Sequence, residues 1–240
     1  MQVKRTSEYS FDTKIRYSET DLKRKLTLPG IINYFQDCTT FHSESIGLGV
    51  EYCGEKKRAW FLSSWQIIID RYPTLAEEVS VHTWATSFKG MMGDRNFCIR
   101  DQKGNKIARA NSLWVYMDLE KGRPAKPDSE DIAKYGLGEP QDMENMSRKI
   151  ELPEHAVGKE AVLVRKYHMD TNGHMNNCHY VQIALDALEE DIAVSQLRVE
   201  YKKSAVYNDI IIPKVAKETE RTVVELVSED GKHFAIVELK

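Results

Sequence analysis

The segment from Asp170 to Asn177 reads Asp-Thr-Asn-Gly-His-Met-Asn-Asn and places several reactive side-chain types close together. Histidine has an ordinary pKa close to neutrality, so His174 is a candidate general base. Asp170, four residues earlier, could orient the imidazole and hold its tautomer, and the Asn172 amide could donate to a carbonyl or an attacking water. A helical pattern follows, so backbone N–H groups without intrahelical partners should lie nearby and could stabilise an oxyanion.

Two other interpretations of this segment stay open. In the first, Asp170 and Asn172 form an Asx turn, Asn176 caps the following helix, and His174 is a surface residue. In the second, His168, Asp170 and His174 bind a metal, although oxygen and nitrogen ligands on one loop give weak support for such a site. Spacing alone does not choose among the three.

The composition is that of an ordinary globular protein, with 41% hydrophobic and 30% charged residues among 240. The net charge of −3 predicts neither nucleic-acid nor anionic-membrane binding by the molecule as a whole. No apolar run reaches the length of a spanning helix, and residues 1–12 lack the character of a signal or transit peptide, so the cytoplasm is expected. The four cysteines are scattered without a C-x-x-C pair, which favours reduced thiols over a zinc or redox centre.

The chain repeats one pattern of elements. A strand over 9–17 and a helix after Thr27 precede strands at 59–71, 78–88, 95–101 and 106–118. A strand over 161–167 and a helix over 176–190 precede strands at 195–204, 209–218, 222–228 and 233–239. Asp21 and Asp170 follow Ile15-Arg16 and Val164-Arg165 at equal distances, which predicts two copies of one unit. A helix across an antiparallel sheet, repeated, is an α+β fold.

Between the copies, proline, glycine and charged residues replace large apolar ones. The sequence therefore predicts a first unit over residues 1–120, a linker over 121–155 that crosses the surface, and a second unit over 156–240. A short helix is expected within the linker, over 129–135.

The stretch from His168 to Tyr180, together with Val199-Glu200-Tyr201-Lys202-Lys203, resembles the acyl-acyl carrier protein thioesterases of plants and bacteria. Those proteins carry D-x-N-x-H-x-N-N-x-x-Y followed by E-Y-[KR]-[KR]. The resemblance implies a double hot-dog, two tandem units that each wrap an antiparallel sheet around a long helix. It also implies hydrolysis of fatty acyl-acyl carrier protein, with the carrier as partner and no cofactor or metal. Asp170, Asn172 and His174 match the family's catalytic aspartate, asparagine and histidine.

One position departs from the family pattern. After E-Y-[KR]-[KR] the family commonly has a glutamate and then a cysteine or small residue, where this chain has Ser204 and Ala205. Glu200 would share a strand face with Ser204 but lie some 13 Å away, which is too far to replace the missing carboxylate. We therefore expect His174 to activate water directly, with Ser204 as a candidate to position that water.

The first copy has no histidine near Asp21, so we expect it to hold the acyl chain while the second copy does the chemistry. Large apolar residues of the first copy are either tunnel lining or ordinary core: Ile31, Ile32, Phe35, Trp60, Phe61 and Trp65. Basic runs at 23–25, 56–58 and 202–203 are candidates to contact the acidic carrier protein, and the last is favoured because it adjoins Ser204.

Two rival functions remain at this point. One is a hot-dog thioesterase that acts on acyl-coenzyme A, and the other is a non-catalytic acyl-binding or dehydratase-like hot-dog. The sequence leaves acyl chain length open. It also leaves open whether two chains associate as a homodimer.

Overall fold

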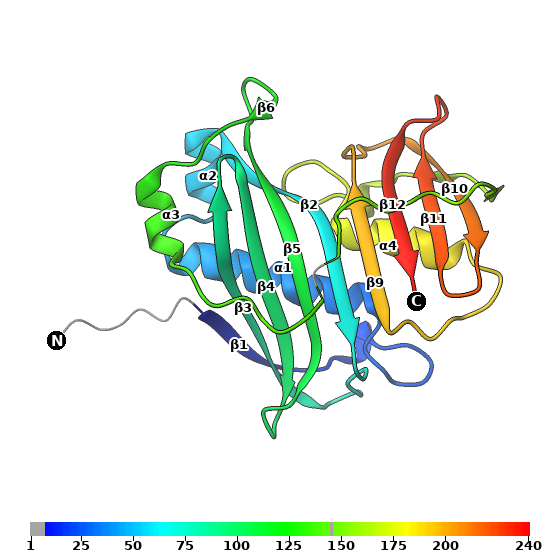
Figure 1. Ribbon diagram of the computed structural model, residues 1–240, viewed down its shortest axis with the longest axis horizontal. Coiled ribbons are helices and arrows are strands. Elements are labelled where there is room, and N and C mark those ends of the chain that lie inside the picture. Colours follow the sequence, from blue (N-terminus) through cyan, green and yellow to red (C-terminus); the bar gives the residue numbers. More distant parts are fainter. Residues whose placement is uncertain (1–7, 145) are drawn as a thin grey trace.

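The computed structural model describes residues 8–144 and 146–240 (Figure 1). Within these residues, twelve strands form one sheet whose main path runs β1-β3-β4-β5-β2-β9-β12-β11-β10-β7. The strands of the first half are β1 (Glu8–Lys14), β2 (Arg58–Ile69), β3 (Glu78–Lys89), β4 (Met92–Asp101), β5 (Lys106–Asp118) and the short β6 (Arg123–Pro124). Those of the second half are β7 (Val157–Gly158), β8 (Val162–Leu163), β9 (Gln196–Tyr201), β10 (Ile210–Lys217), β11 (Thr222–Val227) and β12 (His233–Leu239).

The sheet has an internal two-fold pattern centred on the antiparallel pair β2–β9. The order β1-β3-β4-β5-β2 on one side is mirrored on the other by β9-β12-β11-β10, with β8 pairing to β10 as β1 pairs to β3. Pairing across the centre runs from Ser64 opposite Glu200 to Ile68 opposite Gln196. The predicted repeat is therefore present, and its two copies share one continuous sheet.

Two helices pack on one face of this sheet, α1 (Leu28–Ser45) in the first half and α4 (Asn177–Asp186) in the second. The Thr27 hydroxyl accepts a hydrogen bond from the Gly30 N–H and caps α1, and the Asn176 side chain caps α4 through the Cys178 N–H. Helical spacing places an apolar stripe of α1 in the core, where Phe35 is fully buried and packs against Trp65 and Phe97.

The opposite face of the sheet is covered by chain rather than by helices. After α3 (Ser129–Tyr135), residues 136–144 and 146–150 cross the strands, as Figure 1 shows in green. The Gln141 side-chain amide donates to Phe97 and Ala110 carbonyls, and the Arg198 guanidinium donates to Ser147 and Lys149 carbonyls. These bonds satisfy polar side chains and backbone groups that would otherwise be buried without partners. The predicted short helix at 129–135 is confirmed.

Several element boundaries differ from the sequence expectation. A further helix, α2 (Val50–Lys56), was not predicted. β4 already begins at Met92, because Gly90, with φ of +63°, makes the β3–β4 connection a tight two-residue turn. β9 ends at Tyr201 rather than at Ser204, since the Lys202 and Lys203 N–H groups both turn toward the Phe234 carbonyl. The first strand of the second half shrinks to β8, which is followed by the 3-10 turn η2 (Lys166–His168), as η1 (Tyr17–Glu19) follows β1.

Candidate functional site

The loop before α4 is closed by the Asp170 carboxylate. Its Oδ1 accepts from the Asn172 N–H at 2.8 Å and from the His174 N–H at 3.2 Å, and the Asp170 N–H donates to the His174 carbonyl at 2.7 Å. Gly173 has φ of +72°, the left-handed conformation that this tight loop requires. The expected Asx turn and the Asn176 cap are both present, so the loop geometry is explained without any reference to chemistry.

The loop before α1 repeats this hydrogen-bond pattern. Asp21 Oδ1 accepts from the Lys23 N–H at 2.9 Å and from the Lys25 N–H at 2.8 Å, and the Asp21 N–H donates to the Lys25 carbonyl at 2.8 Å. Arg24, with φ of 60°, takes the place of Gly173. The aspartate therefore shapes the loop in both halves, while a histidine stands only at position 174.

The imidazole of His174 is half-buried against the first half of the chain. Its ring centroid lies 5.7 Å from that of Phe61 in an edge-to-face arrangement. Among residues 8–144 and 146–240, no hydrogen bond joins the imidazole to the Asp170 carboxylate, and the side chain of Asn172 is exposed without a protein partner. Both ring nitrogens are thus available to a substrate or to water.

Ser204 lies beside this loop through a main-chain link. The Met175 N–H donates to the Ala205 carbonyl at 2.9 Å, and the Ala205 N–H donates to the Tyr180 hydroxyl at 2.7 Å. Ser204 is half-buried and follows the end of β9. Ser204 thus directly precedes the residue whose backbone binds the loop.

Glu200 cannot take the place of the missing carboxylate. It is 2% exposed, and its oxygens bind the Ile150 N–H at 3.3 Å and Lys202 Nζ at 2.5 Å. Its neighbours Val199 and Tyr201 point toward α4, so strand alternation directs Glu200 to the opposite face of the sheet, under the crossing segment.

The N-terminus of α4 is held from the first half by Gln36 of α1. Gln36 Nε2 donates to Asn176 Oδ1 at 2.9 Å, and Asn177 Nδ2 donates to Gln36 Oε1 at 2.7 Å. Asn176 Oδ1 also accepts from the Cys178 N–H at 3.1 Å. In the described part of the chain the Asn177 N–H has no acceptor, so it is a free helix donor close to the motif.

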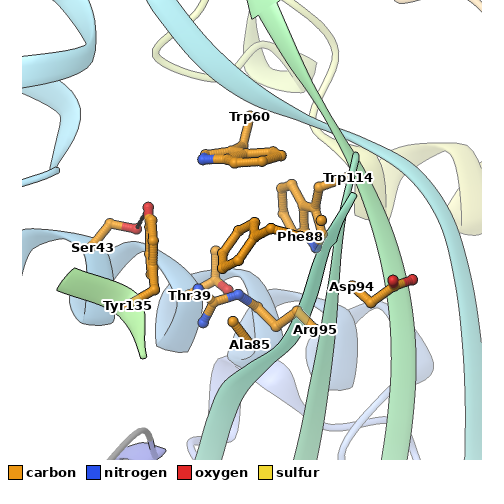
Figure 2. A pocket seen from close by; sticks show the side chains of 10 residues that line it. Thr39, Ser43, Trp60, Ala85, Phe88, Asp94, Arg95, Trp114 and Tyr135 are labelled. Carbon is orange, nitrogen blue, oxygen red and sulfur yellow. Dashed lines mark hydrogen bonds between the residues drawn. The ribbon is translucent and has the colours of Figure 1, made fainter. Parts of the chain in front are cut away.

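A small, partly open cavity lies in the first half, between α1, α3 and the ends of strands β2 to β5. Figure 2 shows its walls, which are largely aromatic: Trp60, Phe88, Trp114 and Tyr135. Trp60 precedes Phe61 on β2, and consecutive strand residues point to opposite sides. One short segment of β2 therefore contributes one side chain to the cavity and the next to the His174 contact.

The predicted tunnel residues divide into three groups. Trp60 lines the cavity and Phe61 contacts His174. Ile31, Ile32, Phe35 and Trp65 are core residues with at most 2% exposure. Sequence reasoning missed Phe88, Trp114 and Tyr135, whose only signal was their aromatic character.

The alternative metal site receives no support from the geometry. His168 Nδ1 accepts from the Arg165 N–H at 3.0 Å, and its ring packs edge-to-face against Tyr167 and at a tilt against His179. Among the described residues, no group of three or more histidine, cysteine, aspartate or glutamate side chains is arranged to hold a metal. Burial raises the pKa of the Cys178 thiol to about 11, so this cysteine is not a thiolate nucleophile.

The sequence matches the family model of the acyl-ACP thioesterase N-terminal domain over residues 6–135 and of the C-terminal domain over residues 153–239. The chain belongs to the acyl-ACP thioesterase family. The palmitoyl-acyl carrier protein thioesterase of Cuphea hookeriana is 28% identical over 207 residues, which cover 79% of this chain and 50% of that protein. The chain spans about half the length of the curated relatives it matches.

Solved structures agree on the architecture. An acyl-ACP thioesterase from Bacteroides thetaiotaomicron has a TM-score of 0.87 at 23% identity, over 97% of both chains. The 12:0-ACP thioesterase of Umbellularia californica has a TM-score of 0.84 at 18% identity, over 98% of this chain and 97% of the other. The expected α+β double hot-dog is confirmed.

Proposed function

We propose that this protein hydrolyses fatty acyl-acyl carrier protein to free fatty acid and carrier protein, by attack of water on the thioester. The observation that carries the proposal is the junction at β2, where Phe61 contacts the unpaired imidazole of His174 and Trp60 lines an aromatic cavity. We take this cavity as the acyl site, because Trp60 and Phe61 are adjacent residues of β2. The plant relatives carry acyl carrier protein thioesterase names, which favour the same substrate class.

In the proposed mechanism His174 removes a proton from water as the oxygen attacks the thioester carbonyl. The Asn172 side chain, which is free and exposed, and the Asn177 N–H donate to the carbonyl oxygen as negative charge develops. Asp170 acts as a positioning residue, because its Oδ1 holds the His174 backbone. The protonated imidazole then donates to the departing thiolate of the phosphopantetheine arm.

Ser204 takes the position where the family commonly has a carboxylate, and we propose that its hydroxyl positions the attacking water. A hydroxyl can accept and donate to water but cannot remove a proton at neutral pH. His174 is then the single base of the site.

The same proposal divides the chain by role. Residues 1–120, described from Glu8 onward, form the acyl-binding unit, residues 121–155 form the linker, and residues 156–240 form the catalytic unit. The matched family segments, 6–135 and 153–239, support two units, and the first segment extends through α3 into the proposed linker. No helix in the described part of the chain is long and apolar enough to cross a membrane. The cytoplasmic location and a homodimer both stay predictions.

For the carrier protein we propose a docking site at Lys202 and Lys203, which are exposed and follow directly from β9. Lys203 Nζ lies 5.2 Å from the Phe234 ring centroid, while Lys202 is paired with Glu200. Lys203 is therefore the side chain whose charge a carrier protein can use most freely.

A thiol-release assay tests the proposed function. Acyl carrier protein and coenzyme A, each loaded with acyl chains of several lengths, are incubated with the protein, and free thiol is followed over time. We expect release from the carrier-bound substrates at kcat/KM at least tenfold above that for the coenzyme A thioesters. Preference for coenzyme A would identify an acyl-CoA thioesterase, and no release from either would identify a non-catalytic acyl-binding protein.

A further inference from the structure

The cavity of the first half contains a buried cation. Arg95 projects from β4 and is 7% exposed, and Figure 2 shows its guanidinium beside Thr39. Nη1 donates to His42 Nδ1 at 3.0 Å and to Thr83 Oγ1 at 3.1 Å, and the guanidinium carbon lies 5.2 Å from the centroid of the Tyr135 ring. Since an arginine side chain stays protonated, a full positive charge lies inside the protein.

The protein offers this charge only neutral partners. Burial and the Arg95 charge lower the pKa of His42 to about 4, so its ring is neutral and accepts the hydrogen bond. Asp94 lines the same cavity, but it accepts from the Ser87 hydroxyl, and Figure 2 shows its carboxylate directed away from the guanidinium. Within residues 8–144 and 146–240, Arg95 forms no ion pair. A buried and uncompensated charge is costly, so an anionic group placed beside it is strongly favoured.

A second donor without a partner lies in the same wall. The Thr39 hydroxyl is buried and has no hydrogen-bond partner in the described part of the chain. Thr39 lines the cavity from α1, next to the Arg95 guanidinium. Most buried polar side chains are paired, so an unpaired hydroxyl and an unneutralised guanidinium side by side mark a place for an acceptor that the protein does not itself supply.

We propose that this cavity selects acyl chains that carry an acceptor oxygen far from the thioester, with a terminal carboxylate bound most tightly by Arg95 and Thr39. The inference rests on the proposed function, because it takes the cavity as the acyl site. Phe61 is level with Val115 of β5 and Met92 of β4, three residues before Arg95. With ordinary strand spacing, the Cα atoms of Phe61 and Arg95 are therefore about 14 Å apart. The recognised oxygen must then lie on the distal part of the chain.

A binding experiment tests this without any turnover. The change in tryptophan fluorescence, which comes from Trp60 and Trp114 of the cavity and from Trp65 and Trp84 elsewhere, is measured with three esters: methyl dodecanoate, methyl ω-hydroxydodecanoate and monomethyl dodecanedioate. Their octanoyl and hexadecanoyl counterparts are measured in the same way. The methyl ester replaces the thioester end, so that each probe differs only at its far end. At the best length we expect the monomethyl diacid to bind on the order of tenfold more tightly than the unsubstituted ester, with the hydroxy ester between them.

Two variants assign that preference to the two donors. Arg95→Met keeps the length of the side chain and removes the charge, and it should abolish the preference for the diacid. Thr39→Val keeps the shape and removes the hydroxyl, and it should reduce the preference about threefold. If Arg95→Met does not fold, as judged by circular dichroism, Thr39→Val decides. The proposal would be overturned if the wild-type protein bound the three esters with equal affinity at every chain length. It would also be overturned if the preference for the diacid were unchanged in Thr39→Val.

Thiol release separates this inference from the proposed function. A protein that binds the diacid ester through Arg95 but releases no thiol from any carrier-bound substrate refutes the proposed function and leaves the inference standing. A protein that hydrolyses dodecanoyl- and dodecanedioyl-carrier protein with equal kcat/KM, and binds the three esters equally, refutes the inference alone.

Discussion

The loops Asp21–Lys25 and Asp170–His174 have the same backbone hydrogen bonds and carry different side chains. In each, one aspartate oxygen accepts from two N–H groups, and a capped helix follows. Only the second loop has an imidazole at its end, and that imidazole lies against Phe61 of the first half. Since both halves build the loop without using the histidine, His174 is not needed for the fold, and its presence calls for a chemical explanation.

The strands of the two halves differ in length, and here the first half is the more elaborate one. Strands β2 and β5 of the first half have 12 and 13 residues, whereas β9 and β12 have 6 and 7. The extra length of β2 to β5, with α3 beside it, encloses the cavity. The two halves thus share one plan and differ in detail: the second loop ends in a histidine, and the first half of the sheet borders the cavity.

The largest effect is expected when the equivalent residues of the two loops, His174 and Lys25, are each replaced by alanine. His174→Ala should reduce turnover of acyl-carrier protein a hundredfold or more, because it removes the proposed general base. Lys25→Ala, at the equivalent position of the first loop, should leave kcat within about twofold, since surface substitutions rarely matter. Near-native turnover by His174→Ala would remove this residue from the mechanism.

The two halves also contain histidines of opposite character, His42 buried under Arg95 and His174 half-exposed. The folded protein binds a proton on His42 only near pH 4, while the unfolded chain binds it near pH 6.5. The stability that this difference provides is complete above pH 6.5 and declines as the pH falls toward 4. It amounts to a loss of about 2 kcal/mol near pH 5 relative to neutral pH.

Urea denaturation of wild type and His42→Gln at neutral pH and near pH 5 measures this term. The wild-type protein should lose about 2 kcal/mol more than the variant between the two conditions. The histidines with lowered pKa elsewhere, His82, His168 and His179, are unchanged in the variant and cancel in the difference. An equal acid dependence of the two proteins would contradict a buried neutral His42.

The cavity can be narrowed without touching either loop. A Cβ at Gly93 would lie 3.1 Å from Phe88 and 3.2 Å from Trp60, closer than van der Waals contact allows comfortably. Gly93→Val should therefore lower kcat/KM for the longest accepted chain on the order of tenfold, and for the shortest chain much less. Gly158→Val on β7, where a Cβ meets nothing within 4 Å, is the matched control. An unchanged chain-length profile in Gly93→Val would show that acyl chains do not use this cavity.

Asparagine and alanine separate the two roles open to Asp170. Asn keeps an oxygen that can accept from the Asn172 and His174 N–H groups, so Asp170→Asn should retain kcat within about threefold. Asp170→Ala removes that acceptor and should cost nearly tenfold. Asp21→Ala removes the equivalent acceptor from the first loop, and its free energy of unfolding measures how much stability that loss costs. If kcat of Asp170→Asn falls as far as kcat of Asp170→Ala, the negative charge of the carboxylate itself acts on the imidazole.

The smallest expected effect concerns the carrier protein. Main-chain bonds from Leu26 to Pro73 and from Met175 to Ala205 make Arg71 the first-half equivalent of Lys203, and Arg71 is neutralised by Glu77 at 2.6 Å. Lys203→Glu should raise KM for carrier-bound substrate about fivefold and leave a small thioester unaffected.

Lys103→Glu is the control for this charge reversal. Lys103 lies in the β4–β5 turn, at the end of the sheet where β2 reaches Ile69 and thus far from Phe61. It should change neither KM. Equal effects of Lys203→Glu on both substrates would exclude docking at this position.

Much of the fold could be read from the chain, because its signals are local. Turn residues and apolar periodicity placed α1, α3 and most strands, and the equal spacing of Asp21 and Asp170 revealed the duplication. The helix α2 and the true end of β9 could not be read, since the second depends on a carbonyl of Phe234 that lies more than thirty residues away.

By itself the sequence determined the residue types of the loop at 170–174, the serine at position 204 and the two-unit plan, because each depends on residue type and near-neighbour spacing. Only the tertiary structure decided which side chains contact one another and which face of the sheet each one lies on. It occupied the Asp170 oxygen with backbone amides, turned Glu200 to the covered face, and assembled the cavity around Arg95 from α1, α3 and four strands. Such contacts join residues far apart in the chain, and their geometry follows from sheet register and helix packing, which no short sequence pattern contains.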